Sequence, residues 1–138
     1  MVEDDPEFAA DMQAVLAGIV RLDRVPNTAM AAAWLIRRPP DLLWLDLDLP
    51  PFFALTGGFE GLAFLRLVRE RLAPELPVIV VSGRLTPEVR RELHGLEPLT
   101  CFGKPPELGA LVRALTATSR VRAQGLRDER RNSREGLG

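Results

Sequence analysis

The stretch that decides the fold is Leu42-Leu43-Trp44-Leu45-Asp46-Leu47-Asp48-Leu49-Pro50. Its first four residues are all apolar, which indicates a strand that is buried on both faces. The stretch Val78-Ile79-Val80-Val81 has the same character and is followed by Ser82-Gly83. Strands buried on both faces are typical of parallel sheets covered by helices on each side, so these two stretches predict an α/β fold.

The segments around these strands predict helices and two shorter strands. Asp5 and Pro6 suit the start of a first helix, as N-cap and first helical residue. Its inward face is predicted to carry Phe8, Met12, Val15, Leu16 and Ile19. A second helix is predicted to begin at Asn27 or Thr28, to carry Met30, Trp34 and Leu35, and to end before Pro39-Pro40. Three more helices are predicted: one over about 60–72, one that begins at Thr86-Pro87, and one that begins at Pro105-Pro106. Short strands are predicted over 20–25 and 99–102, and a loop over 50–58.

The bulk properties exclude several classes of protein. A chain of 138 residues is long enough for one domain with a substantial core. The net charge of −1 predicts no general attraction to nucleic acid or to a membrane surface, and no apolar run is long enough to span a bilayer. The single cysteine cannot form an internal disulfide, which favours a reducing, cytoplasmic setting. The acidic residues at positions 3–5 are not typical of a signal peptide.

Polar residues follow the predicted strands at their carboxyl ends, where open α/β sheets carry their chemistry. They are Glu3 and Asp4 after a strand stub, Asp46 and Asp48, Ser82, and Lys104. Lys104 is the only lysine among the chain's 18 basic residues. Clustered carboxylates repel one another unless a cation neutralises them, and Mg²⁺ binds carboxylates together with phosphate oxygens. A carboxylate can also be the nucleophile that forms an aspartyl phosphate.

These residues resemble the receiver domain of bacterial two-component response regulators. The acidic pair matches Glu3-Asp4, and the phospho-accepting aspartate with a proline four residues later matches Asp46 and Pro50. The switch hydroxyl matches Ser82, and the Lys-Pro pair, whose peptide bond is usually cis in that family, matches Lys104-Pro105. The resemblance covers about residues 1–117. Residues 118–138 are interpreted as an Arg-rich helical extension or a disordered tail.

The resemblance implies a flavodoxin-like fold, with a three-layer doubly wound parallel sheet of strand order 2-1-3-4-5. It implies that Asp46 accepts a phosphoryl group from a histidine kinase or phosphotransfer protein, with Lys104 and Ser82 assisting. Mg²⁺ would be held by Asp4 and Asp46, helped by Glu3 through a water and by the backbone carbonyl of Asp48. The chain would then signal to a downstream protein partner, with homodimerisation left open, and would catalyse at most its own phosphorylation and dephosphorylation.

Three features depart from the family pattern. Only Met1 and Val2 precede Glu3, so the first strand is truncated, and we expect residues upstream of Met1 or a partner to cover its neighbours. The loop over 51–58 is long and apolar, with Phe52 and Phe53 expected to form a lid over the site or a docking patch. Cys101 stands where the family has its switch aromatic, and the side chain of Phe102 is expected on the opposite face.

Two alternative functions stay open. A receiver-like module could bind partners without phosphorylation. A haloacid-dehalogenase phosphatase would use the Asp-x-Asp of Asp46-Leu47-Asp48, but that class needs metal carboxylates after the lysine. Other residues have structural interpretations: His94 at a helix end, Cys101 as a small buried side chain, and Trp34 and Trp44 in the core. The tail arginines, in the range 120–134, are interpreted as solvated.

Overall fold

The computed structural model describes residues 1–49 and 60–136. The predicted loop over 50–58, with Phe52 and Phe53, lies outside these residues. A parallel sheet of β1 (Leu43–Leu45), β2 (Val78–Ser82) and β3 (Leu99–Gly103) forms the centre, in the order β1-β2-β3. Every residue of β1 and β2 is buried. The prediction of strands enclosed on both faces is therefore confirmed.

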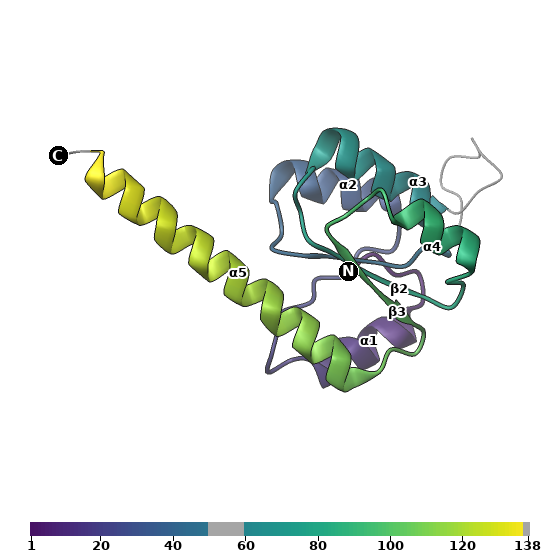
Figure 1. Cartoon of the computed structure of the whole chain (residues 1–138). Coiled ribbons are helices and arrows are strands. Elements are labelled where there is room, and N and C mark those ends of the chain that lie inside the picture. The colour runs from purple at the N-terminus through teal and green to yellow at the C-terminus, as the bar shows by residue number, and fades with distance from the viewer. Residues whose placement is uncertain (50–59, 137–138) are drawn as a thin grey trace.

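The helices form a layer on each side of the sheet (Figure 1). On one side lie α1 (Pro6–Val15) and α5 (Leu108–Glu135), and on the other lie α2 (Thr28–Arg37), α3 (Glu60–Leu67) and α4 (Pro87–Leu93). Each layer has its own apolar cluster: Met12, Leu16, Leu111 and Leu115 pack under α1 and α5, and Leu35, Leu65, Val68 and Leu93 pack on the other side. The three-layer α/β fold is as predicted.

The first strand is reduced to a single paired residue, Val2. Val2 forms parallel bridges with Val25 on one side and Leu45 on the other. Its amide donates to the Trp44 carbonyl (2.8 Å) and its carbonyl accepts from the Asp46 amide (3.1 Å). The sequence of neighbours is thus Val25, Val2, β1, β2, β3, which corresponds to the predicted order 2-1-3-4-5.

The predicted strand over 20–25 is wrong apart from Val25. Strand residues need a partner, and Val25 pairs with the short segment around Val2: its amide donates to the Met1 carbonyl (2.8 Å) and its carbonyl accepts from the Glu3 amide (3.1 Å).

A pocket of about 610 Å³ lies beside Met1 and Val2, between residues 19–25 and 38–44. Trp44 also lines this pocket, and within the described chain its buried indole nitrogen has no hydrogen-bond partner.

Helix starts follow the predicted capping chemistry, with one exception. Asp5 accepts from the amides of Glu7 and Phe8, Asn27 from Met30, and Thr86 from Val89. α5 begins at Leu108 rather than at Pro105-Pro106, because Glu107 is its N-cap and accepts from Gly109 and Ala110. Met12 and the C-cap residue Leu16 are buried as predicted, but Val15 and Ile19, also predicted to face inward, are about half exposed, and α1 ends at Val15.

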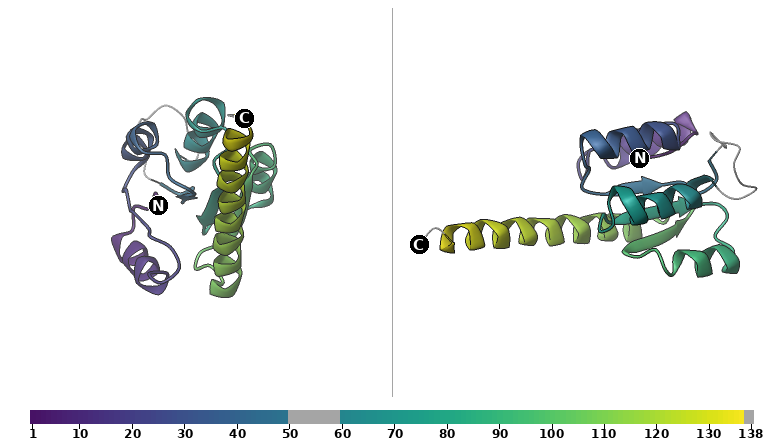
Figure 2. Two further views of the ribbon diagram at one scale, coloured as in Figure 1. Left: turned by 90° about the vertical axis from the view of Figure 1, so that its left-hand side faces the viewer. Right: turned by 90° about the horizontal axis from the view of Figure 1, so that it is seen from above.

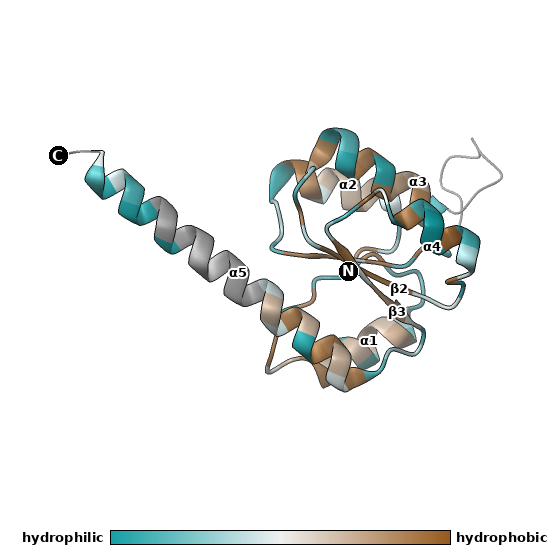
Figure 3. Ribbon diagram, in the orientation of Figure 1, coloured by the Kyte–Doolittle hydropathy of each residue, from teal (hydrophilic) through white to brown (hydrophobic). Residues whose placement is uncertain are grey.

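α5 continues well past the sheet and projects from the body of the domain (Figure 2). Apolar residues gather on the part of the helix next to the sheet, and the far end, up to Glu135, is hydrophilic (Figure 3). In the described part of the chain no helix combines the length and apolar character needed to cross a bilayer. The boundary at residue 117 between domain and extension stays a prediction.

Arg69 ties together the loops at the amino ends of β2 and β3. It lies on a π-helix, Val68–Leu72 (η1), that continues α3. Its guanidinium donates to the backbone carbonyls of Leu76 (2.6 Å), Pro98 (2.6 Å), Leu96 (2.7 Å), Pro74 (3.2 Å) and Ala73 (3.4 Å). The planar fork can serve several carbonyls at once, which a lysine ammonium cannot do in the same geometry.

Replacing Arg69 with methionine should lower the free energy of unfolding by about 2–3 kcal/mol, because it leaves several carbonyls without a charged donor. Urea unfolding of the wild type and the variant measures this change. Arg71→Met on the same π-helix is the control, since Arg71 is exposed, and it should change stability little. Equal stability of the Arg69 and Arg71 variants would show that the carbonyl contacts of Arg69 contribute nothing net.

Candidate functional site

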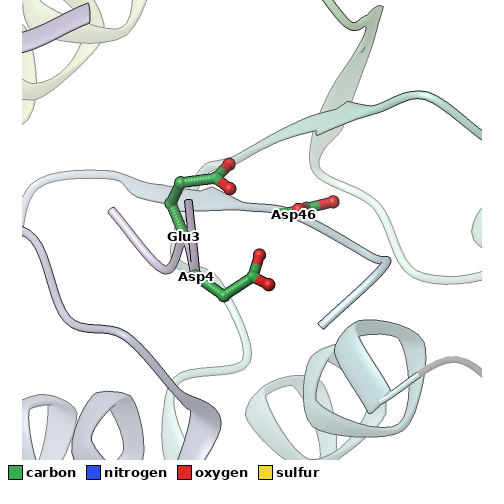
Figure 4. Close-up of side chains that lie close together, drawn as sticks. All are labelled: Glu3, Asp4 and Asp46. Atoms are coloured by element: carbon green, nitrogen blue, oxygen red, sulfur yellow. The ribbon is translucent and has the colours of Figure 1, made fainter. Parts of the chain in front are cut away.

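The carboxyl ends of the strands bring four of the predicted residues together. Glu3 and Asp4 follow Val2, Asp46 follows β1, and Lys104 follows β3. The side chains of Glu3, Asp4 and Asp46 lie close together (Figure 4). One oxygen from each lies within 4.8 Å of the others. Glu3 and Asp46 are almost fully buried, while Asp4 is exposed and opens the group to solvent.

The Lys104 ammonium joins the two buried carboxylates. Its Nζ lies 3.0 and 3.1 Å from the two carboxylate oxygens of Glu3, and 3.4 Å from Oδ2 of Asp46. It also lies 4.5 Å from the centre of the Phe8 ring on α1, a distance that allows a cation–π contact. One small cation therefore connects the end of β3 with the first strand, with β1 and with the first helix.

The ion pair opposes the effect of burial on the pKa of both partners. Burial raises the pKa of Glu3, and the hydrogen bond from Lys104 acts against that rise. For Lys104, burial by itself would lower the pKa, but the hydrogen bond and charge of Glu3 and the charge of Asp46 outweigh it and raise the pKa. With three carboxylates and one ammonium, the cluster can accommodate a further positive charge.

The backbone after β1 is held so that Asp46 has a fixed position. Its Oδ1 accepts from the Asp48 amide (3.0 Å), and the next carbonyl, that of Leu47, accepts from the amide of Gly61 (3.2 Å). Gly61 lies in the first turn of α3 and was not predicted to matter. A Cβ on Gly61 would come within 2.5 Å of Leu47 Cα and still closer to the Asp46 carbonyl oxygen. In the sequence, the only sign of this contact is a glycine near the predicted start of a helix.

The Asp48 carboxylate is not part of the cluster, and the Ser82 hydroxyl contacts the backbone that follows β2. Ser82 ends β2 opposite Gly103 in the register, is almost fully buried, and accepts at Oγ from the Arg84 amide (3.2 Å). The exposed Asp48 carboxylate pairs with the Arg84 guanidinium at 3.4 Å. The Lys104-Pro105 peptide bond is cis, as the resemblance implies.

The two residues near the expected switch position face opposite sides of the sheet. Cys101 is partly buried against the cluster under α2, α3 and α4, and Phe102 packs in the cluster under α1 and α5. Burial raises the pKa of the Cys101 thiol, so it stays protonated at neutral pH. A small thiol thus occupies the face on which the family has an aromatic side chain.

The oxygen atoms at this site suit a hard divalent cation. Mg²⁺ prefers oxygen ligands and is commonly held by one or two carboxylates, with water and phosphate oxygens completing its shell. Three carboxylates that converge from two chain segments, one of them open to solvent, supply that chemistry. Glu3, Asp4 and Asp46 therefore fit a magnesium site.

Comparison with the known protein families and with curated protein sequences finds no match. Comparison with solved structures finds many. The receiver domain of a DNA-binding response regulator from Colwellia psychrerythraea 34H is 25% identical, with a TM-score of 0.70 over 86% of this chain and 94% of that one. The receiver domain of an HD-domain protein from Pseudomonas fluorescens Pf-5 is 17% identical, with a TM-score of 0.75 over 89% and 94%.

The chain has the fold of a response-regulator receiver domain. A receiver domain of a Francisella response regulator is also similar, at 16% identity and a TM-score of 0.72, over 86% of this chain and 93% of that one. These similarities concern the fold of the backbone. The roles of individual residues in this chain remain predictions.

Adding a methyl group at Gly61 should disturb the backbone on which Asp46 sits. Gly61→Ala should lower the free energy of unfolding by about 1–3 kcal/mol, because the helix start can no longer approach Leu47. Urea unfolding measures the loss. Gly95→Ala is the matched control, since nothing lies within 4 Å of a Cβ at that position. Equal stability of the two variants would mean that the close approach at Gly61 relaxes without cost.

Removing the Lys104 ammonium should destabilise the fold in a way that depends on pH. The pKa of Glu3 is already raised by burial, and loss of Lys104 removes a group that opposes the rise. A carboxyl whose pKa is higher in the folded than in the unfolded protein favours the folded state when it is protonated. This contribution is fully present below the unfolded pKa and is lost as the pH rises through the folded pKa. The stability cost of Lys104→Met should therefore be small near pH 4.5 and reach about 3 kcal/mol or more by about pH 8.

Urea unfolding of Lys104→Met and wild type across this pH range tests the expectation. A destabilisation that is the same at both ends of the range would show that Lys104 acts through packing rather than by compensating the buried carboxylates.

Proposed function

We propose that this receiver domain accepts a phosphoryl group on Asp46 in a His–Asp phosphorelay, with Mg²⁺ as cofactor, and switches its protein partner in response. The observation that carries the proposal is the position of Lys104 Nζ between Glu3 and Asp46. A lone ammonium held against a buried carboxylate is suited to a second anion, and a phosphoryl group on Asp46 would supply one.

The residues of the chain have separate roles in the proposed phosphoryl transfer. An oxygen of Asp46 attacks the phosphorus, and the bond from phosphorus to the imidazole nitrogen of the phosphohistidine donor breaks. The Asp48 amide and the Leu47–Gly61 contact hold the Asp46 side chain and backbone in place. Lys104 can move from Glu3 toward the phosphoryl oxygens and balance their charge. Ser82, at the end of β2, is proposed to donate its hydroxyl to the same group.

Glu3, Asp4 and Asp46, with the backbone carbonyl of Asp48, would hold Mg²⁺. When bound, the ion neutralises negative charge on the carboxylates and on the transferring phosphoryl group. This role fits the excess of negative charge that one ammonium leaves in the cluster. Without the cation, an incoming phosphoryl group would meet three carboxylates.

The partners follow from this chemistry. We propose a histidine kinase or phosphotransfer protein as phosphoryl donor, a downstream protein as target, and a cytoplasmic setting for both encounters. The domain would be a signalling module rather than an enzyme that turns over an external substrate. Homodimerisation stays open.

A second candidate is a receiver-like module that binds its partner without phosphorylation. The observation in its favour is Cys101, which lies on the face where the family has its switch aromatic. A thiol is too small to swing between two positions as an aromatic ring can. In that case the carboxylate cluster would be present, but no aromatic ring would change position to report phosphorylation to a partner.

Asp46 should be the sole site of phosphorylation. On incubation with acetyl phosphate and Mg²⁺, the wild type should gain the mass of one phosphoryl group, and Asp46→Asn should gain none, because it lacks the nucleophile. Asp48→Asn is the matched control: its side chain is exposed and turned to Arg84, so most of the labelling should remain. Intact-protein mass spectrometry reads both outcomes. Equal labelling of the wild type and Asp46→Asn would contradict the assignment, and no labelling of the wild type would favour the second candidate.

A further inference from the structure

Arg24 binds the backbone of the two acidic residues that follow the first strand. Its Nε donates to the Glu3 carbonyl (2.9 Å) and its Nη2 donates to the Asp4 carbonyl (3.2 Å). The guanidinium thus spans two consecutive peptide groups, which suits its rigid planar fork. Arg24 is half-buried and precedes Val25, the residue that pairs with Met1 and Glu3.

This contact lies where the regular hydrogen bonding of the sheet ends. Val2 is paired on both sides, and the Glu3 amide still donates to Val25. Asp5 already caps α1 through its side chain. Asp4 lies between these two regular elements, and its carbonyl is held by Arg24. In a sheet whose first strand is a single bridging residue, this bond fixes the residue that precedes the N-cap of the helix.

Arg24 reaches the peptide carbonyls of Glu3 and Asp4, and their carboxylates remain directed toward Asp46 (Figure 4). The guanidinium therefore orients the two acidic residues without occupying the oxygen atoms that a cation would need. Residues that orient metal ligands in this way usually affect metal affinity strongly when they are changed.

We infer that Arg24 is a positioning residue for the magnesium site, holding the Glu3–Asp4 backbone so that both carboxylates converge on Asp46. The inference rests on the proposed function, because it assigns Mg²⁺ to that cluster. Mg²⁺ demands near-ideal octahedral geometry, whereas Ca²⁺ tolerates irregular sets of oxygen ligands. The contribution of Arg24 is accordingly larger for Mg²⁺ than for Ca²⁺.

The test is a calorimetric titration of Mg²⁺ and of Ca²⁺ into the wild type, Arg24→Lys and Arg24→Met. Arg24→Lys keeps the charge and loses the fork, and Arg24→Met loses both. Both variants should weaken Mg²⁺ binding by about tenfold, with a smaller loss for Ca²⁺. In labelling with acetyl phosphate, the Mg²⁺ concentration for half-maximal rate should rise by the same factor, and the rate at saturating Mg²⁺ should stay within about twofold.

Arg21→Met is the matched control, because Arg21 lies on the same segment but is exposed and pairs with Asp23. It should leave the affinity for both ions unchanged. Tighter Mg²⁺ binding by Arg24→Met with no change in Arg24→Lys would mean that Arg24 acts only through its charge, which overturns the inference. Equal losses for Mg²⁺ and Ca²⁺, or loss of the fold in both Arg24 variants, would assign Arg24 to general stability and overturn it as well.

The proposed function fails in a different way. A wild-type protein that binds no Mg²⁺ and takes up no phosphoryl group contradicts the magnesium site itself. A wild type that does both, with Arg24 variants that match it in affinity for each ion, leaves the site intact and removes only the role of Arg24.

Discussion

The contact of one ammonium with two buried carboxylates is the interaction on which the rest of the structure depends. Glu3 and Asp46 end neighbouring strands, and without a cation their charges would repel in a poorly solvated place. Lys104, at the end of β3, pairs with both carboxylates, and its ammonium contacts the ring of Phe8 on α1. Four parts of the chain are thereby held at one edge of the sheet, and the same arrangement provides a site for cation and phosphoryl chemistry.

The short first strand makes that edge dependent on contacts from its neighbours. Val2 alone connects Val25 with β1, so regular pairing ends after one residue. Side-chain and backbone contacts take over: Arg24 holds the carbonyls after Val2, and Gly61 lets α3 approach the backbone after β1. At the opposite edge, Arg69 gathers the carbonyls of the loops before β2 and β3. Backbone groups that a longer strand or regular turns would pair are satisfied here by arginine.

The sequence predicts those features that depend on local pattern. The apolar runs before Asp46 and Ser82 are enough to place two buried parallel strands, and the polar residues after them identify the edge with the site. What it predicts poorly depends on contacts distant in sequence. The alternation over 20–25 resembles a strand, but only Val25 has a strand partner, and Ile19 continues a helical pattern beyond the end of α1. Arg24, Gly61 and Arg69 have no motif, because each owes its role to carbonyl groups brought to it by the fold.

The most direct test of the central role of Lys104 is a crystal structure with Mg²⁺ and beryllofluoride, which mimics a phosphoryl group on aspartate. We expect beryllofluoride on Asp46, Mg²⁺ bound by Asp4 and Asp46, and Lys104 Nζ shifted from Glu3 toward a fluoride. A structure at saturating Mg²⁺ and beryllofluoride with Asp46 unmodified, and with Lys104 still on Glu3, would contradict this role and leave the ion pair as a purely structural contact.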